Sequence, residues 1–301
     1  MRDKKVKVIV GEPTGFCSGV KRAIAIVKKE AKKANGATAV YTLGPIVHNA
    51  EVVNELNRLG IKTIKTEQFR RQNSKKPVVV IRSHGCAPAV VSEINKLGYR
   101  VIDATCPYVR RVQNHASQLK DDGYFTIVVG DKNHPEVKGI IGRAQPLAKV
   151  YHINSIPNIT RNSPFATKIG IIGQTTIPFE RFQGAINSFH MRDYEEIRIF
   201  NTLCKESLNR QKTCKKIADK VDLLIVVGSR NSANTSSLVD IARKRRAKVY
   251  QVEDKSELQR KWFKALQRIG VIAGASTPQS TVFDVVNQIK KFSNRGYYSH
   301  G

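Results

Sequence analysis

Short runs of apolar residues alternate along the chain with amphipathic stretches. The apolar runs are rich in Val and Ile and are continuous, which is typical of parallel strands covered on both faces. Strands are expected at Val6–Val10, Val78–Ile81, Arg100–Ile102, Thr126–Val129, Ile169–Ile172, Ile197–Phe200, Leu223–Val227 and Val271–Ala273. Between them, apolar residues at helical spacing predict helices at Val20–Lys33, Val109–Lys120, Asn209–Lys220 and Ser236–Arg246. This alternation predicts an α/β protein with mostly parallel sheets.

Several predicted strands end in a polar loop that opens a helix. These loops read IRSHGCAP (81–88), VVGDKNHPE (128–136), IIGQTT (171–176), VVGSRNSAN (226–234) and IAGASTP (272–278). In a parallel sheet such loops share one edge, and ligands bind there, outside the carboxyl ends of the strands. The candidate chemistry is therefore expected in these loops.

The charge balance is strongly basic, with 52 Lys and Arg against 24 Asp and Glu, a net charge of +28 over 301 residues. A basic surface attracts polyanions, so a nucleic-acid-binding protein is one alternative. The basic residues are dispersed, however, and the sequence contains no zinc finger, RNP motif or basic leucine zipper. A solvated basic surface is the preferred interpretation, and nucleic acid is not the expected partner.

The sequence contains no run of 18 or more apolar residues, so no membrane span is expected. The first residues, MRDKKVKVIVGEPTG, lack the long apolar stretch and small-residue cleavage site of a signal peptide. A cytoplasmic protein is therefore expected.

The five cysteines are an odd number and are widely spread, which does not suit a disulfide framework. Cys17, Cys106 and Cys204 each lie at a strand-to-helix turn, where a helix N-terminus favours the thiolate. Their spacing suggests three domains that each offer one thiolate to a shared centre. The alternative is three isolated buried thiols, because no C-x2-C pair is present. Cys86 and Cys214 are interpreted as structural.

Three histidines lie at loop-to-helix junctions, namely His48, His84 and His134. Imidazoles at such points can bind phosphate oxygens together with helix N–H groups. Glu136 lies in the last of these loops, two residues after His134. Beside an anion site it suits a proton donor with a raised pKa, whereas the alternative is a first-turn Glu favoured by the helix dipole.

Small hydroxyl and amide side chains complete the set: Thr175, Ser232, Asn234 and Ser276. Each alone is a routine helix N-cap. Together they form an uncharged, hydrogen-bonding cradle for an anion. Neither GxxxxGK[ST] nor GxGxxG occurs, so these motifs give no support for a nucleotide-binding fold.

Taken together, these motifs resemble those of the 4-hydroxy-3-methylbut-2-enyl diphosphate reductase family (IspH/LytB). The matching segments are GFCSGVKRAI (15–24), VHNAEVVNEL (47–56), SHG (83–85), DATCPYV (103–109), GDKNHPEVKG (130–139), GQTT (173–176), C…NRQ (204–211), VVGSRNSAN (226–234) and GASTP (274–278). They occur in the family's order and span nearly the whole chain, so the series is far more specific than any one element.

The resemblance implies three similar α/β domains with mostly parallel sheets, arranged as a trefoil around a central iron–sulfur cluster. The domains are expected at 18–106, at 107–201, and at 1–17 plus 202–292, with a C-terminal tail at 293–301. It also implies one [4Fe–4S] cluster per chain, held by Cys17, Cys106 and Cys204. The fourth iron is then free for substrate.

Roles for the remaining residues follow from the same resemblance. The diphosphate and the substrate hydroxyl are expected at His48, His84, His134, Thr175, Ser232, Ala233, Asn234 and Ser276. Glu136 matches the residue implicated in proton delivery, and Thr175 is the second expected catalytic residue. Two departures stand out: Ala233 occupies a position that is commonly Ser, and Lys205–Ser207 replaces the usual residues after the third cysteine.

The implied activity is the two-electron reductive dehydroxylation of a small allylic diphosphate, (E)-4-hydroxy-3-methylbut-2-enyl diphosphate. The products are isopentenyl and dimethylallyl diphosphates, in the last step of the non-mevalonate pathway. Because no flavin or nicotinamide motif occurs, a ferredoxin or flavodoxin is the expected electron donor, and its acidic surface suits a basic docking face. The alternatives are a non-redox iron–sulfur hydro-lyase, which needs no reductant, and a nucleic-acid-binding protein, which leaves the Cys and His loops unexplained.

Overall fold

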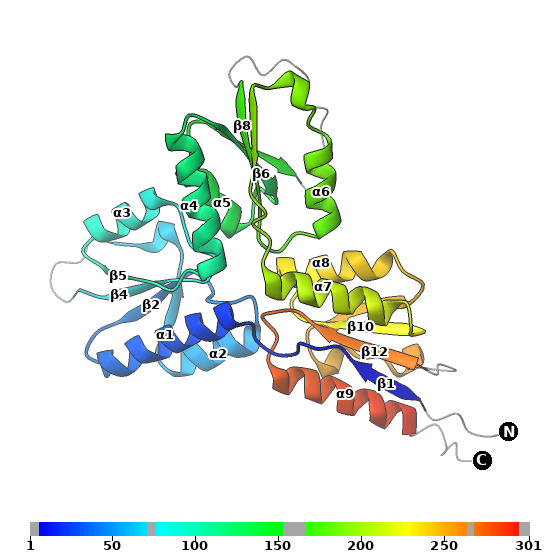
Figure 1. The fold of residues 1–301 in the computed structure, drawn as a ribbon. Helices are drawn as coiled ribbons and strands as arrows, with labels where there is room; N and C mark the ends of the chain where they lie inside the picture. Colours follow the sequence, from blue (N-terminus) through cyan, green and yellow to red (C-terminus); the bar gives the residue numbers. More distant parts are fainter. Residues whose placement is uncertain (1–5, 71–75, 153–166, 264–267, 295–301) are drawn as a thin grey trace, which may run out of the picture. The chain divides into compact units, whose positions relative to one another are not determined.

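The structure is a computed structural model that describes residues 6–70, 76–152, 167–263 and 268–294 (Figure 1). These residues form three four-stranded sheets in which every strand pair is parallel. The chain divides into two compact units, the first built from residues 1–17 and 205–301 and the second from residues 18–204. The predicted α/β class with parallel sheets is confirmed.

The first unit contains one sheet with the strand order β1-β12-β10-β11. Its elements are β1 (Lys7–Val10), α7 (Lys205–Ala218), β10 (Leu223–Val227), α8 (Ala233–Arg243), β11 (Lys248–Val252), η3 (Lys255–Glu257), η4 (Arg260–Phe263), β12 (Arg268–Ala273) and α9 (Gln279–Asn294). Helices α7 and α8 lie on one side of the sheet and α9 on the other (Figure 1). Leu224 and Val226 pack toward α7 and α8, whereas Ile225 and Val227 pack toward α9. A strand covered on both faces explains the unbroken apolar run.

The second unit begins with a sheet of strand order β3-β2-β4-β5. Its elements are α1 (Ser18–Ala34), β2 (Val40–Leu43), α2 (Ala50–Arg58), β3 (Lys62–Ile64), η1 (Thr66–Gln68), β4 (Val78–Ile81), α3 (Pro88–Lys96) and β5 (Arg100–Asp103). Val79 of β4 packs with Ile94 of α3 and with Phe69 and Tyr99, whose rings meet edge to face. This core fixes the loop that follows β4.

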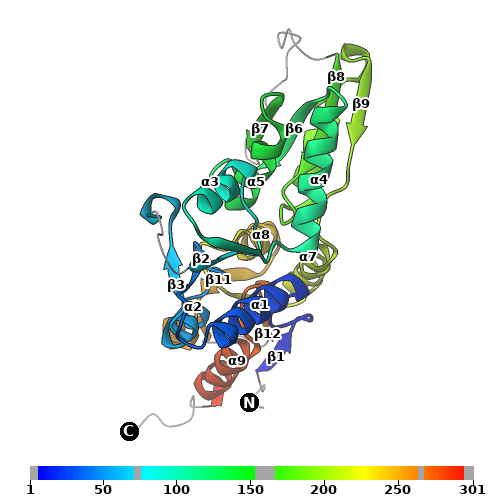
Figure 2. The ribbon, with the colours of Figure 1, turned by 90° about the vertical axis from the view of Figure 1, so that its left-hand side faces the viewer.

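The second unit continues with a sheet of strand order β7-β6-β8-β9. Its elements are α4 (Pro107–Asp121), β6 (Phe125–Gly130), α5 (Pro135–Ala144), β7 (Ala148–His152), β8 (Lys168–Gly173), α6 (Phe179–Asn187), η2 (Met191–Asp193) and β9 (Glu196–Ile199). Figure 2 shows α4 lying along this sheet. The close packing of α4 against β8 requires a glycine at position 170, because a Cβ there would lie 2.4 Å from the Leu119 side chain of α4.

All four predicted helices begin earlier than their apolar pattern indicates, and α1 begins at Ser18 rather than Val20. Helix α4 begins at Pro107 rather than Val109, α7 at Lys205 rather than Asn209, and α8 at Ala233 rather than Ser236. The first turns of α7 and α8 are polar, so hydrophobic periodicity does not mark them. The candidate residues therefore lie directly at helix N-termini, where free N–H groups collect.

The domain boundaries expected from the sequence stay a prediction, and residues 295–301 of the expected tail lie outside the described residues. Within the described ranges, no helix combines the length and the apolar character needed to cross a membrane.

Candidate functional site

The second unit brings the three predicted histidines together. His48 follows β2, His84 follows β4, and His134 follows β6 as the N-cap of α5. The ring centroids of His48 and His84 are 5.4 Å apart, and those of His84 and His134 are 5.1 Å apart. Three loops at the carboxyl ends of parallel strands thus place three imidazoles in one cluster.

Burial keeps these imidazoles neutral. It lowers the pKa of His134 to about 4, with further contributions from the nearby charges of His48 and Arg82. Burial also lowers the pKa of His84 well below the usual value, and the pKa of His48 is lowered by burial and then by Arg82. Near neutral pH each ring therefore has one N–H donor and one acceptor nitrogen.

The tautomer of His134 follows from its own helix. Its Nδ1 accepts a hydrogen bond from the backbone N–H of Glu136 at 3.2 Å. A neutral imidazole with an accepting Nδ1 carries its proton on Nε2. The cap that begins α5 therefore leaves His134 with a donor nitrogen for an anion.

A buried carboxyl, Glu136, lies beside the histidines and is only 1% exposed. The Thr175 backbone N–H donates to its Oε1 at 2.7 Å, and the Thr175 hydroxyl donates to its Oε2 at 3.0 Å. Burial raises the pKa of Glu136 to about 7, although both hydrogen bonds from Thr175 act in the opposite direction. Both protonation states are then available near neutral pH, as a group that transfers protons requires.

Two of the three candidate thiols belong to this unit. The backbone N–H of Cys106 donates to Ser83 O at 2.9 Å, and that of Cys204 donates to Thr175 O at 2.9 Å. Each cysteine is therefore tied to a loop that carries another candidate residue. Burial raises the pKa of the Cys106 thiol, and hydrogen bonds from the N–H groups at the start of α4 oppose that rise. Cys204 lies near enough to raise the pKa of Cys106 further.

The first unit gathers the other five predicted residues, Cys17, Ser232, Ala233, Asn234 and Ser276, at one sheet edge. The Ala275 N–H donates to Asn234 Oδ1 at 3.0 Å, while Ala275 O accepts from the Cys17 N–H at 3.0 Å. The hydroxyl of Ser276 donates to that of Ser232 at 3.3 Å. Backbone and side-chain contacts therefore connect the loops after β1, β10 and β12.

The two departures from the family pattern have different structural consequences. Asn234 Nδ2 donates to the buried Ser207 hydroxyl at 2.9 Å, so the last residue of Lys205–Ser207 orients a candidate site amide. Ala233 is the first residue of α8, directly after the Ser232 N-cap. At that position its backbone N–H is among the first four of the helix, which lack a partner within the helix.

Sequence reasoning missed Arg210, which is 3% exposed. Its guanidinium donates to the carbonyls of Pro13 and Gly15 at 2.7 Å each and of Ala273 at 3.0 Å. Gly15 has φ +74°, a conformation that side-chain-bearing residues rarely adopt. Arg210 therefore holds the turn that leads to Cys17.

The helical spacing of residues in α7 indicates that Arg210 faces the protein interior. The buried face of α7 consists of Ser207, Arg210, Gln211, Cys214, Ile217 and Ala218. An arginine in register with Cys214 and Ile217 faces the protein interior, where a charge needs partners.

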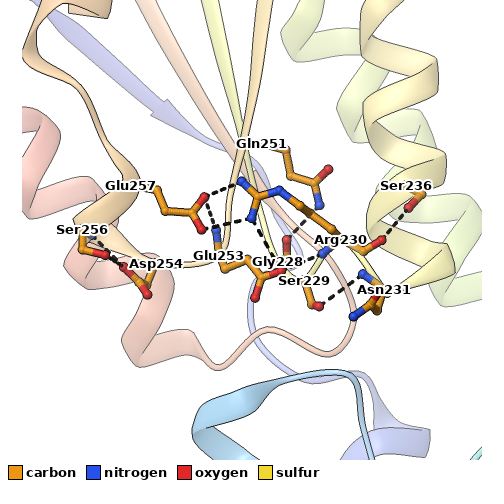
Figure 3. Close-up of polar contacts among 10 residues, drawn as sticks. All are labelled: Gly228, Ser229, Arg230, Asn231, Ser236, Gln251, Glu253, Asp254, Ser256 and Glu257. Atoms are coloured by element: carbon orange, nitrogen blue, oxygen red, sulfur yellow. Dashed lines mark hydrogen bonds and ion pairs between the residues drawn. The ribbon is translucent and has the colours of Figure 1, made fainter.

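Figure 3 shows the polar contacts between the loop after β10 and the segment that follows β11. Glu257 accepts two hydrogen bonds from the Arg230 guanidinium, at 3.0 and 2.6 Å. Glu253 accepts from the Arg230 backbone N–H at 2.9 Å. These contacts secure the segment that precedes Ser232 and Asn234.

The donor set fits a thiolate-bound metal. Cys17, Cys106 and Cys204 form no disulfide bond within the described part of the chain, and the backbone N–H groups of Tyr108 and Val109 donate to the Cys106 thiol. Among the residues that the structure describes, no three His, Cys, Asp or Glu side chains form a metal-binding group. Cys106 and Cys204 belong to the second unit and Cys17 to the first.

Comparison with known proteins gives consistent matches over nearly the full length. The family model described as LytB protein matches residues 8–290. A relative from Aquifex aeolicus (strain VF5), named 4-hydroxy-3-methylbut-2-enyl diphosphate reductase, is 38% identical over 287 residues, covering 95% of this chain and 96% of its own. A relative of the same name from Dehalococcoides mccartyi (strain CBDB1) is 39% identical over 296 residues, covering 96% of this chain and 99% of its own.

Two solved structures are also similar. One is (E)-4-hydroxy-3-methyl-but-2-enyl diphosphate reductase, described as the terminal enzyme of the non-mevalonate pathway, with 37% identity, a TM-score of 0.65 and coverage of 95% of this chain and 99% of its own. The other is the E-1-hydroxy-2-methyl-but-2-enyl-4-diphosphate reductase from Plasmodium falciparum, with 27% identity and a TM-score of 0.83. The match covers 94% of this chain and 87% of the Plasmodium chain.

Substitution of Arg210 tests its structural role. Arg210→Gln leaves buried carbonyls without their charged donor, and we expect the free energy of unfolding to fall by about 3 kcal/mol. Urea unfolding followed by fluorescence reports on this unit, because the chain's single tryptophan, Trp262, packs there against Tyr250.

Arg230→Gln is the matched control, because the Arg230 side chain is 56% exposed. Loss of a surface ion pair is expected to lower the free energy of unfolding by less than about 1 kcal/mol. Equal effects of the two substitutions would show that Arg210 has no special role.

Proposed function

The chain belongs to the LytB protein family, and we propose that its site converts (E)-4-hydroxy-3-methylbut-2-enyl diphosphate to isopentenyl and dimethylallyl diphosphates. It is an oxidoreductase of the non-mevalonate pathway to isoprenoids. The family match extends over residues 8–290, so it includes all of the loops described above. Neither the hydro-lyase nor the nucleic-acid alternative agrees with the names of the relatives.

The reaction fixes what the site must supply. Two electrons and two protons enter, the C–O bond to the terminal hydroxyl breaks, and the oxygen leaves as water. One proton converts the leaving hydroxyl to water, and the other proton is added to the allylic carbon framework. The protein must therefore hold a diphosphate and bring a proton to an oxygen in a water-poor site.

The observation that carries the proposal is the pairing of Glu136 with Thr175 beside three neutral histidines. Neutral imidazoles donate hydrogen bonds to phosphate oxygens without adding a titrating charge. In the first unit, the Ser232 and Ser276 hydroxyls and the Asn234 amide have the same neutral donor character. We infer that these residues together bind the diphosphate and the substrate hydroxyl.

The proton route follows from the Glu136–Thr175 geometry. When Glu136 is protonated, its Oε2 donates to the Thr175 hydroxyl and reverses the 3.0 Å hydrogen bond. The Thr175 hydrogen is then free to point toward the substrate oxygen. Concerted transfer of one proton from Thr175 to that oxygen and of another from Glu136 to Thr175 delivers one proton, leaves Thr175 neutral and leaves Glu136 as the carboxylate.

Cys17, Cys106 and Cys204 would hold the [4Fe–4S] cluster that the family implies. When bound, the cluster supplies the one-electron steps and an iron with an open position. The chain's contribution is to provide thiolates, and the N–H groups at the start of α4 favour the thiolate form of Cys106.

Electrons must come from a partner, for which we propose an acidic ferredoxin or flavodoxin. The net charge of +28 supports an electrostatic encounter with a protein of this kind. The cytoplasmic location expected from the sequence stays a prediction, which cell fractionation tests.

Serine substitutions test the thiol assignment. Cys17→Ser, Cys106→Ser and Cys204→Ser should each lose the cluster or the activity, because a site with three protein ligands has no replacement. Cys86→Ser and Cys214→Ser are the controls and should keep both. Iron content and visible absorption after anaerobic purification are the measurements, and a full cluster with full activity in Cys106→Ser would contradict the assignment.

Replacement of Glu136 tests the proton route. Glu136→Gln keeps size and hydrogen bonding but has no acidic proton, so turnover should fall by about 10²-fold or more, the scale of losing a general acid. Cluster content and substrate affinity should stay close to those of the unchanged protein. Glu93→Gln, on the exposed side of α3, is the control. Loss of the cluster or of binding in Glu136→Gln would mean a structural role instead.

Salt tests the docking proposal. Reduction of the protein by an acidic carrier should slow steeply as ionic strength rises, because screening weakens attraction between exposed charges. Reduction by a small uncharged chemical reductant should change much less. Stopped-flow rates with both donors give the comparison, and equal salt dependence would place the effect at the substrate site.

A further inference from the structure

A pocket of about 380 Å³ lies within the second unit, next to the histidine cluster. Its walls come from the loop after β2, from η1, from the loop between β4 and α3, and from the start of α5. Gly85 and Pro135 belong to this wall, and each directly follows a candidate histidine in the sequence. No candidate site residue lines the pocket itself, so the pocket is a site separate from the histidine cluster.

The pocket is cationic. Lys65, Arg82 and Lys138 line it, against the single carboxylate of Glu67. Within the described ranges of the chain, none of these three cations forms an ion pair with a carboxylate. Arg82 is the informative member, because it is half-buried and burial lowers its pKa. A half-buried guanidinium without a carboxylate partner is suited to binding an anion.

The loop after β2 is shaped around this guanidinium. Gly44 has φ +69°, and a Cβ built there would lie 2.8 Å from Arg82 Nη1. A side chain at this position would therefore displace the guanidinium from the wall of the pocket. The glycine allows Arg82 to occupy its place, where two lysines supplement its charge.

The remaining wall is apolar. Leu43, Ala87 and Val90 line the same pocket, and Val90 packs at the edge of the core around Val79. A cationic end combined with an aliphatic wall suits an anion that carries a short hydrocarbon. A volume of about 380 Å³ lies within the usual range of small-ligand pockets.

We propose that this pocket binds a second small isoprenoid diphosphate, with the diphosphate on Lys65, Arg82 and Lys138 and the hydrocarbon against the aliphatic wall. The hydrocarbon part of this assignment rests on the proposed function, since the reaction makes such esters. The anion part rests on the charges of the pocket alone.

Arg82 couples the pocket to the histidines. Its charge is one of the causes that lower the pKa values of His48, His84 and His134, so it lies within electrostatic reach of the whole cluster. A diphosphate in the pocket neutralises that charge and weakens the attraction for a second diphosphate at the histidines. The product therefore inhibits by raising the KM for substrate from a separate site, and the coupling is reciprocal.

Calorimetric titration of the cluster-loaded, oxidised protein with isopentenyl diphosphate tests the proposal. We expect two binding events per chain. Lys65→Ala combined with Lys138→Ala should weaken one event by at least about tenfold, the scale of losing charged hydrogen bonds, and should leave the other unchanged. Lys62→Ala combined with Lys96→Ala removes the same charge from exposed positions outside the pocket and should leave both events intact.

Inorganic pyrophosphate is the second probe. It lacks the hydrocarbon, and we expect it to bind the pocket at least about tenfold more weakly than isopentenyl diphosphate does. A single binding event in the unchanged protein would overturn the proposal, as would equal weakening in both double variants. Equal affinity for pyrophosphate would overturn the isoprenoid assignment. Absence of reductase activity would contradict the proposed function, but the count of binding events would still decide whether the pocket binds an anion.

Discussion

In a parallel sheet all strands end at the same edge, and in this chain each sheet uses that edge for polar residues. Central strands such as β4 and β10 are apolar and buried on both faces, so they offer no place for a charged or hydrogen-bonding group. Chemistry is thereby confined to the loops and to the first helical turns. His48, His84 and His134 meet for this reason, although up to 86 residues separate them in the sequence.

Two buried ionisable groups show how the same burial gives different outcomes. Arg210 has three backbone carbonyls as acceptors, so its charge is compensated and its role is structural. Glu136 has donors from Thr175 alone, and burial outweighs them, so its pKa rises to about 7. A guanidinium keeps its proton and needs acceptors when it is buried, whereas a carboxyl whose pKa lies near 7 can gain and lose one.

The sequence predicted the parallel α/β class, many of the strands and the candidate site loops because these depend on local pattern, whereas β2, β3, β7 and β11 were not predicted. Continuous apolar runs located strands such as β4 and β10, and polar loops after strands located the candidate residues. Three features escaped prediction because they depend on tertiary partners. The role of Arg210 requires the distant carbonyl of Ala273, the first turns of α7 and α8 have no apolar period, and the orientation of Asn234 depends on Ser207, which lies 27 residues away.

One of the chain's many cations, Arg82, lies beside the histidine cluster in the second unit. Arg82 forms no ion pair with a carboxylate among the described residues. Its positive charge helps to lower the pKa values of His48 and His84 and so helps to keep both rings neutral. Neutral donors bind a diphosphate without needing to be protonated, so binding varies little with pH in the neutral range, while the nearby charge of Arg82 supplies attraction. A protein that used protonated histidines instead would lose its anion site as pH rose through their pKa. Separating the attracting charge from the hydrogen-bond donors avoids that loss, and it leaves Arg82 open to a second anion.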